Sequence, residues 1–208
     1  MAEELGEGDA YDALVKRLEP LLRAGDAAGC ERLILDRLAG MPESPFHIAT
    51  GLTFAVHPGV VAEEFDGFFS RQSKRFPVGA LSTEMNEFQT NTRSWYYEKF
   101  AYREYGGRAD DFDWVSRWDG QSQAGTNLMG MSKLQRVYAS KAGKASEQFQ
   151  ASLVAGLLVQ ARFWCLLADA TSFMKKVNVP LLVSAHDTGL ILELHPNAVP
   201  AAAADGGA

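Results

Sequence analysis

Residues 95–105 read WYYEKFAYREY, and this stretch decides the fold. Aromatic residues favour extended chain, and the segment ends at Gly106 and Gly107, which predicts a strand. Successive side chains of a strand point to opposite faces, so Trp95 and Tyr97 must oppose Tyr96. Rings therefore occur on both faces, and at least one of these faces must be covered by helices.

The segments on either side of this strand predict a small antiparallel meander. Leu81, Thr83 and Met85 alternate as in a strand, and Asn91-Thr92 supplies turn-forming residues before Trp95. After the two glycines, Trp114 and Trp118 share parity with Phe112, which predicts a further strand over 112–118. The connections are too short for parallel crossovers, so we expect antiparallel pairing across residues 80–119.

The longest helical pattern lies C-terminal to this meander, over residues 144–176, and contains no proline. Its middle, residues 153–168, is apolar over most of the helix circumference, which predicts a helix buried between other layers. Two short strands should follow, at 179–185 and 190–194. Residues 186–189 (His-Asp-Thr-Gly) form a plausible hairpin turn between them.

The N-terminal part of the chain is predicted to be mostly helical. Apolar residues recur at three- and four-residue steps over 11–22, where Pro20 suggests a break or kink, and Gly25-Asp26 offers a stop and a new N-cap. Helices are also expected up to Gly40, over 60–76 and over 132–140. Between them, residues 46–56 alternate with a period of two, which predicts a strand.

These elements predict one α+β domain over residues 9–195, with tails at 1–8 and 196–208. The sheet should be mainly antiparallel, with about five to six strands. It should be packed with helices that include one long buried C-terminal helix.

The net charge of the chain limits the classes of partner that it is expected to bind. The 208 residues carry a formal net charge of −6 and contain no basic run, which disfavours nucleic acid and favours a basic protein partner. The N-terminus is acidic where a signal peptide would be basic, and the run Leu153–Ala168 is interrupted by Gln160 and Arg162. We therefore expect no membrane span and a cytoplasmic location.

Motifs for cofactors and metals are not found. The sequence contains no glycine-rich phosphate loop, which predicts no cofactor, and two cysteines, Cys30 and Cys165, are too few for a thiolate metal site. His47 and His57 stand ten residues apart on the strand predicted over 46–56, too far apart to share an ion. The sequence predicts no metal site.

The most distinctive short motif is Ser-Ala-His-Asp-Thr at 184–188. It resembles the His-Asp element of the histidine phosphatase superfamily, which delivers a histidine and an acid to a phosphate. That family also requires an Arg-His-Gly motif, which is absent, so we assign no phosphatase. A hydrolase-like site that combines His186 and Asp187 with a sheet carboxylate such as Glu84 remains an alternative.

The aromatic and acidic central segment is the leading candidate for function. Tyrosine and tryptophan beside acids suit the binding of a basic protein surface, as in inhibitor or immunity-type proteins, although aromatic residues on a strand are more often core. A flat aromatic and acidic surface without converging titratable groups would favour binding, whereas a cleft that joins His186 to acids with shifted pKa values would favour the hydrolase. Carbohydrate binding by the same rings is a third possibility. The candidate binding residues are Tyr102, Tyr105, Asp111, Asp113, Trp114 and Trp118.

Overall fold

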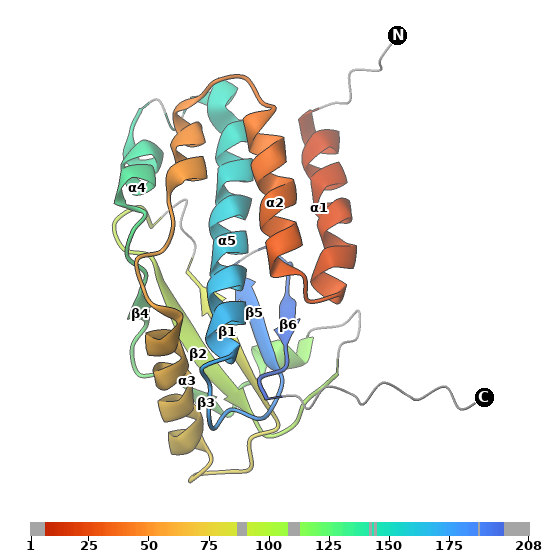
Figure 1. The fold of residues 1–208 in the computed structure, drawn as a ribbon, viewed down its shortest axis with the longest axis vertical. Helices are drawn as coiled ribbons and strands as arrows, with labels where there is room; N and C mark the ends of the chain where they lie inside the picture. Colours follow the sequence, from red (N-terminus) through yellow and green to blue (C-terminus); the bar gives the residue numbers. More distant parts are fainter. Residues whose placement is uncertain are drawn as a thin grey trace, which may run out of the picture.

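The computed structural model describes residues 7–86, 91–107, 113–141, 143, 145–186 and 188–197. Four long helices and one sheet dominate it (Figure 1). The helices are α1 (Glu7–Arg23), α2 (Ala27–Ala39), α3 (Pro58–Gln72), α4 (Ser132–Ala139) and α5 (Phe149–Thr171), with short 3-10 helices η1 (Pro45–Gly51), η2 (Asp113–Ser116) and η4 (Ser146–Gln148). The strands are β1 (Ala80–Met85), β2 (Tyr96–Tyr102), β3 (Gly120–Gln121), β4 (Thr126–Asn127), β5 (Leu181–Ala185) and β6 (Leu192–Leu194).

The sheet is mixed, with the order β3-β2-β1-β5-β6 and with β4 also paired to β2. The β1–β2, β2–β3 and β2–β4 pairs are antiparallel, as the meander predicts, and so is the β5–β6 pair. The β1–β5 pair is parallel, so the sheet, expected to be mainly antiparallel, is mixed. Parallel neighbours need a long crossover, and the chain between β1 and β5, which includes α5, supplies it.

One face of the sheet is covered by helices. In Figure 1 α3 and α5 lie in front of the strands, and α2 and α1 lie beside the upper part of α5. The ring of Tyr97 on β2 stacks on Phe65 of α3 with centroids 6.1 Å apart, and its centroid lies 5.4 Å from that of Phe163 of α5. The predicted α+β domain with a long buried C-terminal helix is therefore confirmed.

The helix α5 is buried on nearly all sides because it contacts α2 and η1 as well as the sheet. By length and composition it could cross a membrane, but 83% of its most apolar window is buried inside the protein. The amide nitrogen of Gln160 finds partners there, because Nε2 donates to Thr188 Oγ1 and to the Leu190 carbonyl, at 2.9 and 3.2 Å. This burial is that of a core helix.

The strand predicted over 46–56 is wrong, because residues 45–51 form the 3-10 helix η1. Pro45 begins this helix, and Phe46 and Ala49, both fully buried, lie three residues apart, which is one 3-10 turn. The guanidinium of Arg162 on α5 donates to the carbonyls of Ala49 and Thr50. A long-range contact thus adds donors at the end of the short helix, where the Ala49 carbonyl also accepts from Leu52 N at 3.2 Å.

The strand predicted over 112–118 is also wrong within the described residues, because 113–116 form η2 and strand structure begins only at Gly120. Trp114 of η2 packs edge-on against Tyr102 and Tyr105, with ring centroids 5.0 and 5.7 Å away. Residues spaced four apart also share one side of a helix, so the parity of the two tryptophans does not distinguish these structures.

The N-terminal helix ends where predicted. Gly25 adopts a φ of 72°, and Asp26 N donates to the Leu21 carbonyl and caps α2 by accepting from Gly29 N at 2.8 Å. The break suggested at Pro20 does not occur, because α1 continues to Arg23. Helix α1 begins at Glu7, within the predicted tail 1–8, and most of the predicted tail 196–208 lies outside the described residues.

Candidate functional site

The face of the sheet opposite α3 and α5 carries the candidate site. Tyr97 and Ala101 of β2 are fully buried on the helix side, so strand alternation places Tyr96, Glu98 and Phe100 on the other side. The same alternation places Glu84 of β1 on this face. His186 follows β5, and its backbone N–H donates to the Met85 carbonyl at 2.9 Å. Side chains from three neighbouring strands therefore meet here.

A hollow of about 540 Å³ opens on this face. That volume lies within the range of small-ligand pockets. The hollow combines carboxylates, amides, a histidine and aromatic rings. It is lined by Glu84, Asn86, Asn91, Tyr96, Glu98, Phe100, Trp118, Gln121 and His186.

Two glutamates oppose each other at this hollow. Glu84 and Glu98 are direct partners in the β1–β2 register. Like charges directly opposite on neighbouring strands destabilise a sheet. His186 contacts one of the two carboxylates, because its Nδ1 lies 2.6 Å from Glu84 Oε1. Among the described lining residues there is no lysine or arginine, so the balance of charge in the hollow is negative.

Aromatic rings form another part of the wall. The Trp118 side chain is 48% exposed, and its ring centroid lies 5.0 Å from that of Phe100, with the planes at 52°. The Tyr96 ring lies against the backbone of Gly125, where an added Cβ would stand 2.3 Å from a ring carbon. Gly125 thus permits the position of this ring at the hollow.

The other predicted aromatic residues are packed beside the hollow. Tyr102 is only 3% exposed; its hydroxyl donates to the Val115 carbonyl at 2.8 Å and lies 2.8 Å from Ser82 Oγ. The Tyr105 hydroxyl donates to Glu193 Oε1 at 2.6 Å. Together with Trp114 these rings form a second apolar cluster rather than an exposed surface.

The acidic residues of the predicted sites are described only in part. Asp111 and Asp187 lie outside the described residues, and Asp113 begins η2 with a side chain that is not described. Of the predicted binding residues, Trp118 alone is among those that line the hollow in the described part of the chain. The structure does bring together His186 and Glu84 of the predicted hydrolytic site.

Sequence reasoning missed several lining residues, of which Glu98 matters most. Its signal was present: it shares parity with Tyr96 and Phe100 on the predicted strand, and the hairpin register places it opposite Glu84. The amides Asn86, Asn91 and Gln121 carried no such signal.

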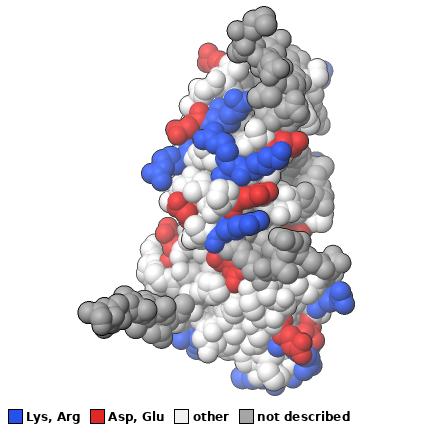
Figure 2. Space-filling view, turned by 90° about the vertical axis from the view of Figure 1, so that its right-hand side faces the viewer, with Lys and Arg blue, Asp and Glu red and all other residues white. Residues whose placement is uncertain are grey.

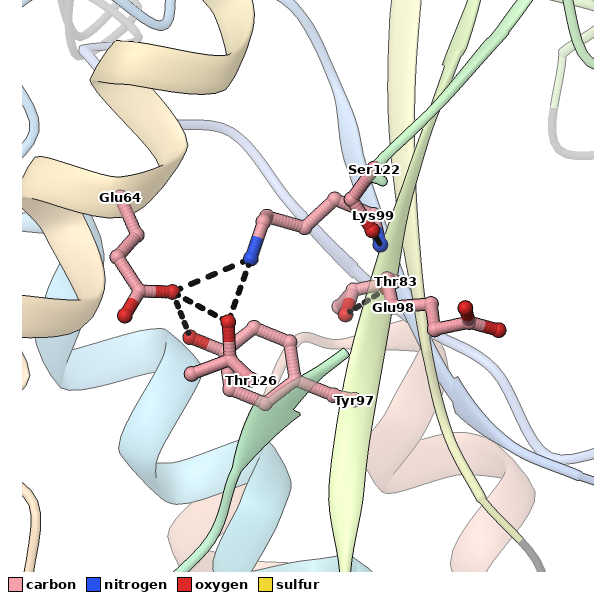
Figure 3. Close-up of polar contacts among 7 residues, drawn as sticks. All are labelled: Glu64, Thr83, Tyr97, Glu98, Lys99, Ser122 and Thr126. Atoms are coloured by element: carbon pink, nitrogen blue, oxygen red, sulfur yellow. Dashed lines mark hydrogen bonds and ion pairs between the residues drawn. The ribbon is translucent and has the colours of Figure 1, made fainter. Parts of the chain in front are cut away.

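A second polar cluster lies on the helix side of β2, between α3 and β4 (Figure 3). Lys99 Nζ lies 3.1 Å from Glu64 Oε2 and donates to Thr126 Oγ1 at 2.8 Å, and Tyr97 Oη and Thr126 Oγ1 both donate to the same carboxylate oxygen. The ammonium also lies 4.7 Å from the Tyr97 ring centroid. The cluster ties α3 to β2 and β4, directly behind the hollow.

Burial and charge shift the pKa values in this cluster. Burial lowers the pKa of Lys99 despite the neighbouring Glu64 carboxylate. Burial alone would raise the pKa of Glu64, but the hydrogen bond from Thr126 and the Lys99 ammonium outweigh it and lower that pKa. Lys99 Nζ contacts a carboxylate of α3 and a hydroxyl of β4, so the cluster ties these two elements to β2.

The cysteines are poor nucleophiles. Burial raises the pKa of Cys30 to about 12, and burial together with Glu31 raises the pKa of Cys165 to about 12. Within the described ranges, no group of three or more His, Cys, Asp or Glu side chains is arranged to hold a metal ion.

A hollow of similar volume, about 540 Å³, lies between α1 and α2. Its wall mixes Lys16, Arg17 and Arg32 with Asp26 and Asp36. Figure 2 shows the α1 side of the molecule, where basic and acidic side chains alternate over the upper part and uncharged residues dominate the lower part. Because both signs of charge line this hollow, it does not favour a ligand of either charge.

Comparison with protein-family models, curated proteins and solved structures found no match for the chain. The function must therefore be argued from the geometry of the hollow on the open sheet face.

Proposed function

We propose that the chain is a non-enzymatic binding protein in the cytoplasm, whose open-face hollow receives a cationic group of a basic protein partner. The observation that carries the proposal is the direct opposition of Glu84 and Glu98 across a hollow whose described lining contains no lysine or arginine. Locally unfavourable arrangements of this kind concentrate at functional sites, because a ligand compensates for them.

A bound cation would relieve the repulsion between the two carboxylates. It would also lie beside Trp118, whose half-exposed indole attracts cations through its negative ring face. The overall charge of −6 supports the same partner, since it accelerates encounter with a basic protein.

The sign of the charge argues against hydrolysis of esters, amides or phosphates. In those reactions negative charge develops on oxygen in the transition state, and enzymes stabilise it with hydrogen-bond donors, cations or metals. Two glutamates opposite each other would instead raise the energy of such a transition state. The hollow is therefore better suited to a positively charged group.

A second candidate function rests on the 2.6 Å contact between His186 and Glu84. A histidine oriented by a carboxylate is a common arrangement for general acid–base catalysis, and the cleft that joins them is the geometry expected of the hydrolytic alternative. The negative charge limits this alternative to reactions with a positive transition state, such as glycoside hydrolysis by paired carboxylates.

The test is a binding titration with capped pentapeptides Gly-Gly-Xaa-Gly-Gly, where Xaa is arginine, lysine or glutamate. We follow the Trp118 indole N–H by NMR, because this ring lies at the hollow. The cationic peptides should shift this signal, more weakly as salt is raised, and the glutamate peptide should not.

Variants locate the site. Glu84→Gln and Glu98→Gln should each weaken the cationic peptides about tenfold, the effect of losing one charged contact of about 1.4 kcal/mol. The matched control is Glu63→Gln on the exposed side of α3, which removes the same charge elsewhere. If neither cationic peptide binds, or if Glu63→Gln weakens them as much, the proposal is wrong. Turnover of aryl glycosides that depends on Glu84 would support the second candidate instead.

A further inference from the structure

We infer that the group recognised by the hollow is the planar guanidinium of an arginine side chain rather than the ammonium of lysine. This inference rests on the proposed function and specifies the chemistry of the partner. Three properties of the hollow carry it: the spread of its acceptors, its exposed ring and its openness.

The acceptors lie on several elements and do not converge on one point. Glu84 and Glu98 come from adjacent strands, where the Cβ atoms of directly opposed residues lie about 5 Å apart. The side chains of Asn91 and Gln121 add polar groups around them. The Asn86 carbonyl is already engaged, because it accepts from Tyr96 N at 2.8 Å. A guanidinium has five donors fixed in one plane and can bind both carboxylates, whereas an ammonium is a compact point charge with three donors.

The aromatic wall adds a preference for a planar cation. Trp118 packs against Phe100 at an angle of 52° and keeps about half of its own surface exposed at the hollow. A guanidinium stacks flat on such a ring while its edge donates to carboxylates, and an ammonium cannot do both.

Arg103 and Lys99 show two environments in which the protein itself holds a cation. Arg103 Nε lies 3.0 Å from Asp119 Oδ1 while its guanidinium lies 4.9 Å from the Phe76 ring centroid, at the surface. Lys99, by contrast, is held in a narrow buried site by acceptors that converge on Nζ. The open hollow resembles the first environment, with carboxylate and ring side by side.

The openness of the hollow acts in the same direction. An ammonium keeps its water in an open site because it is strongly hydrated, whereas a guanidinium is weakly hydrated and loses its water more easily. The cost of bringing arginine against the indole is therefore smaller than the cost for lysine.

The experiment compares capped Gly-Gly-Xaa-Gly-Gly peptides that carry arginine, lysine or citrulline. Citrulline keeps the planar shape of arginine without its charge. Affinities are measured by NMR titration of the wild-type chain and of Trp118→Leu. In Trp118→Leu the reporter is the backbone N–H of Gln121, which lines the hollow.

We expect arginine to bind at least tenfold more tightly than lysine, and citrulline to bind at least tenfold more weakly than arginine. Trp118→Leu should reduce arginine binding more than lysine binding, so that the two affinities approach each other. The exposed position of Trp118 keeps the fold intact, and the thermal midpoint of the variant provides the check.

The outcomes separate the two proposals. Equal affinity for arginine and lysine, both lost in Glu98→Gln, would overturn the guanidinium inference and leave the cation-binding function standing. Tight binding of citrulline, or no binding of either cation, would contradict the proposed function itself. A Trp118→Leu variant that keeps the full preference for arginine would exclude stacking as its cause and overturn the inference in this form.

Discussion

Lys99 of β2 and Glu64 of α3 form an ion pair in which the lysine side chain is 5% exposed and the glutamate side chain is 34% exposed. The two partners are thus buried to different degrees. The lysine has lost most of its water, whereas the glutamate retains part of its hydration. Removal of the glutamate should therefore change the free energy of unfolding by a different amount from removal of the lysine.

Glu64→Gln should lower the free energy of unfolding by about 3 kcal/mol, because it leaves a buried ammonium without its counter-charge. Lys99→Met should cost less, about 1 kcal/mol, since the remaining carboxylate keeps the hydroxyl donors of Thr126 and Tyr97. The double variant should lie within about 1 kcal/mol of wild type. Urea unfolding of all four proteins measures the cycle, and additive single effects would show that the pair is not coupled.

The same pair predicts a pH dependence. The pKa of Glu64 is lower in the folded protein than its ordinary value of 4.5, so the unfolded chain binds the proton more tightly. The contribution of the ionised carboxylate to stability is therefore complete above the unfolded pKa and is lost as the pH falls through the folded pKa. The stability difference between wild type and Glu64→Gln should shrink from pH 6 to pH 3. A difference that stays constant over this range would contradict the assignment.

The Arg162 guanidinium joins α5 to η1 and α2. It donates to the Ala49 and Thr50 carbonyls and lies 3.0 Å from Glu31 Oε1. Arg162→Met should lower the free energy of unfolding by about 3 kcal/mol, because it removes the counter-charge of the half-buried Glu31 carboxylate and a donor to the Ala49 and Thr50 carbonyls. Arg37→Met on the exposed side of α2 is the control and should be nearly neutral. Thermal and urea unfolding compare them, and equal effects would refute the role of Arg162.

Gly130 has a φ of 109°, and a Cβ at this position would lie 2.2 Å from the Thr53 carbonyl oxygen. Gly130→Ala should therefore destabilise by about 3 kcal/mol or more, through backbone strain and a clash with rigid backbone. Gly51→Ala meets nothing within 4 Å and serves as the control. Because Gly130 precedes α4, hydrogen exchange should report faster opening there in the variant. An unchanged unfolding midpoint would contradict the backbone assignment.

The sequence pattern predicted an element correctly where the burial of that element follows from its own residues. The aromatic alternation of β2 and the proline-free apolar run of α5 each reflect burial that the neighbouring residues determine, and both predictions are confirmed. The period-two pattern at 46–56 was misleading, because Phe46 and Ala49 also fit a 3-10 turn. What stabilises that turn is Arg162, which is distant in the sequence and leaves no local signal.

The candidate site likewise combines residues that a local pattern identifies with contacts that depend on distant parts of the chain. Glu84 and His186 could be singled out, but their contact depends on the parallel β1–β5 pair, which no local pattern encodes. Glu98 could have been found by parity alone. The packing of Tyr102 and Trp114 could not be predicted, because it depends on η2 packing against the sheet face opposite α3 and α5.

The parallel pairing of β1 with β5 also has a consequence for biosynthesis. Because β5 is the penultimate strand among the described residues, a nascent polypeptide that has already formed the β1–β2 hairpin still presents the unpaired side of β1. An exposed strand edge invites pairing with other chains, and pairings between distant residues form slowly. Until residues 181–185 leave the ribosome, the hairpin exposes the edge at which the finished molecule aligns Glu84 with Ser184, the residue two positions before His186.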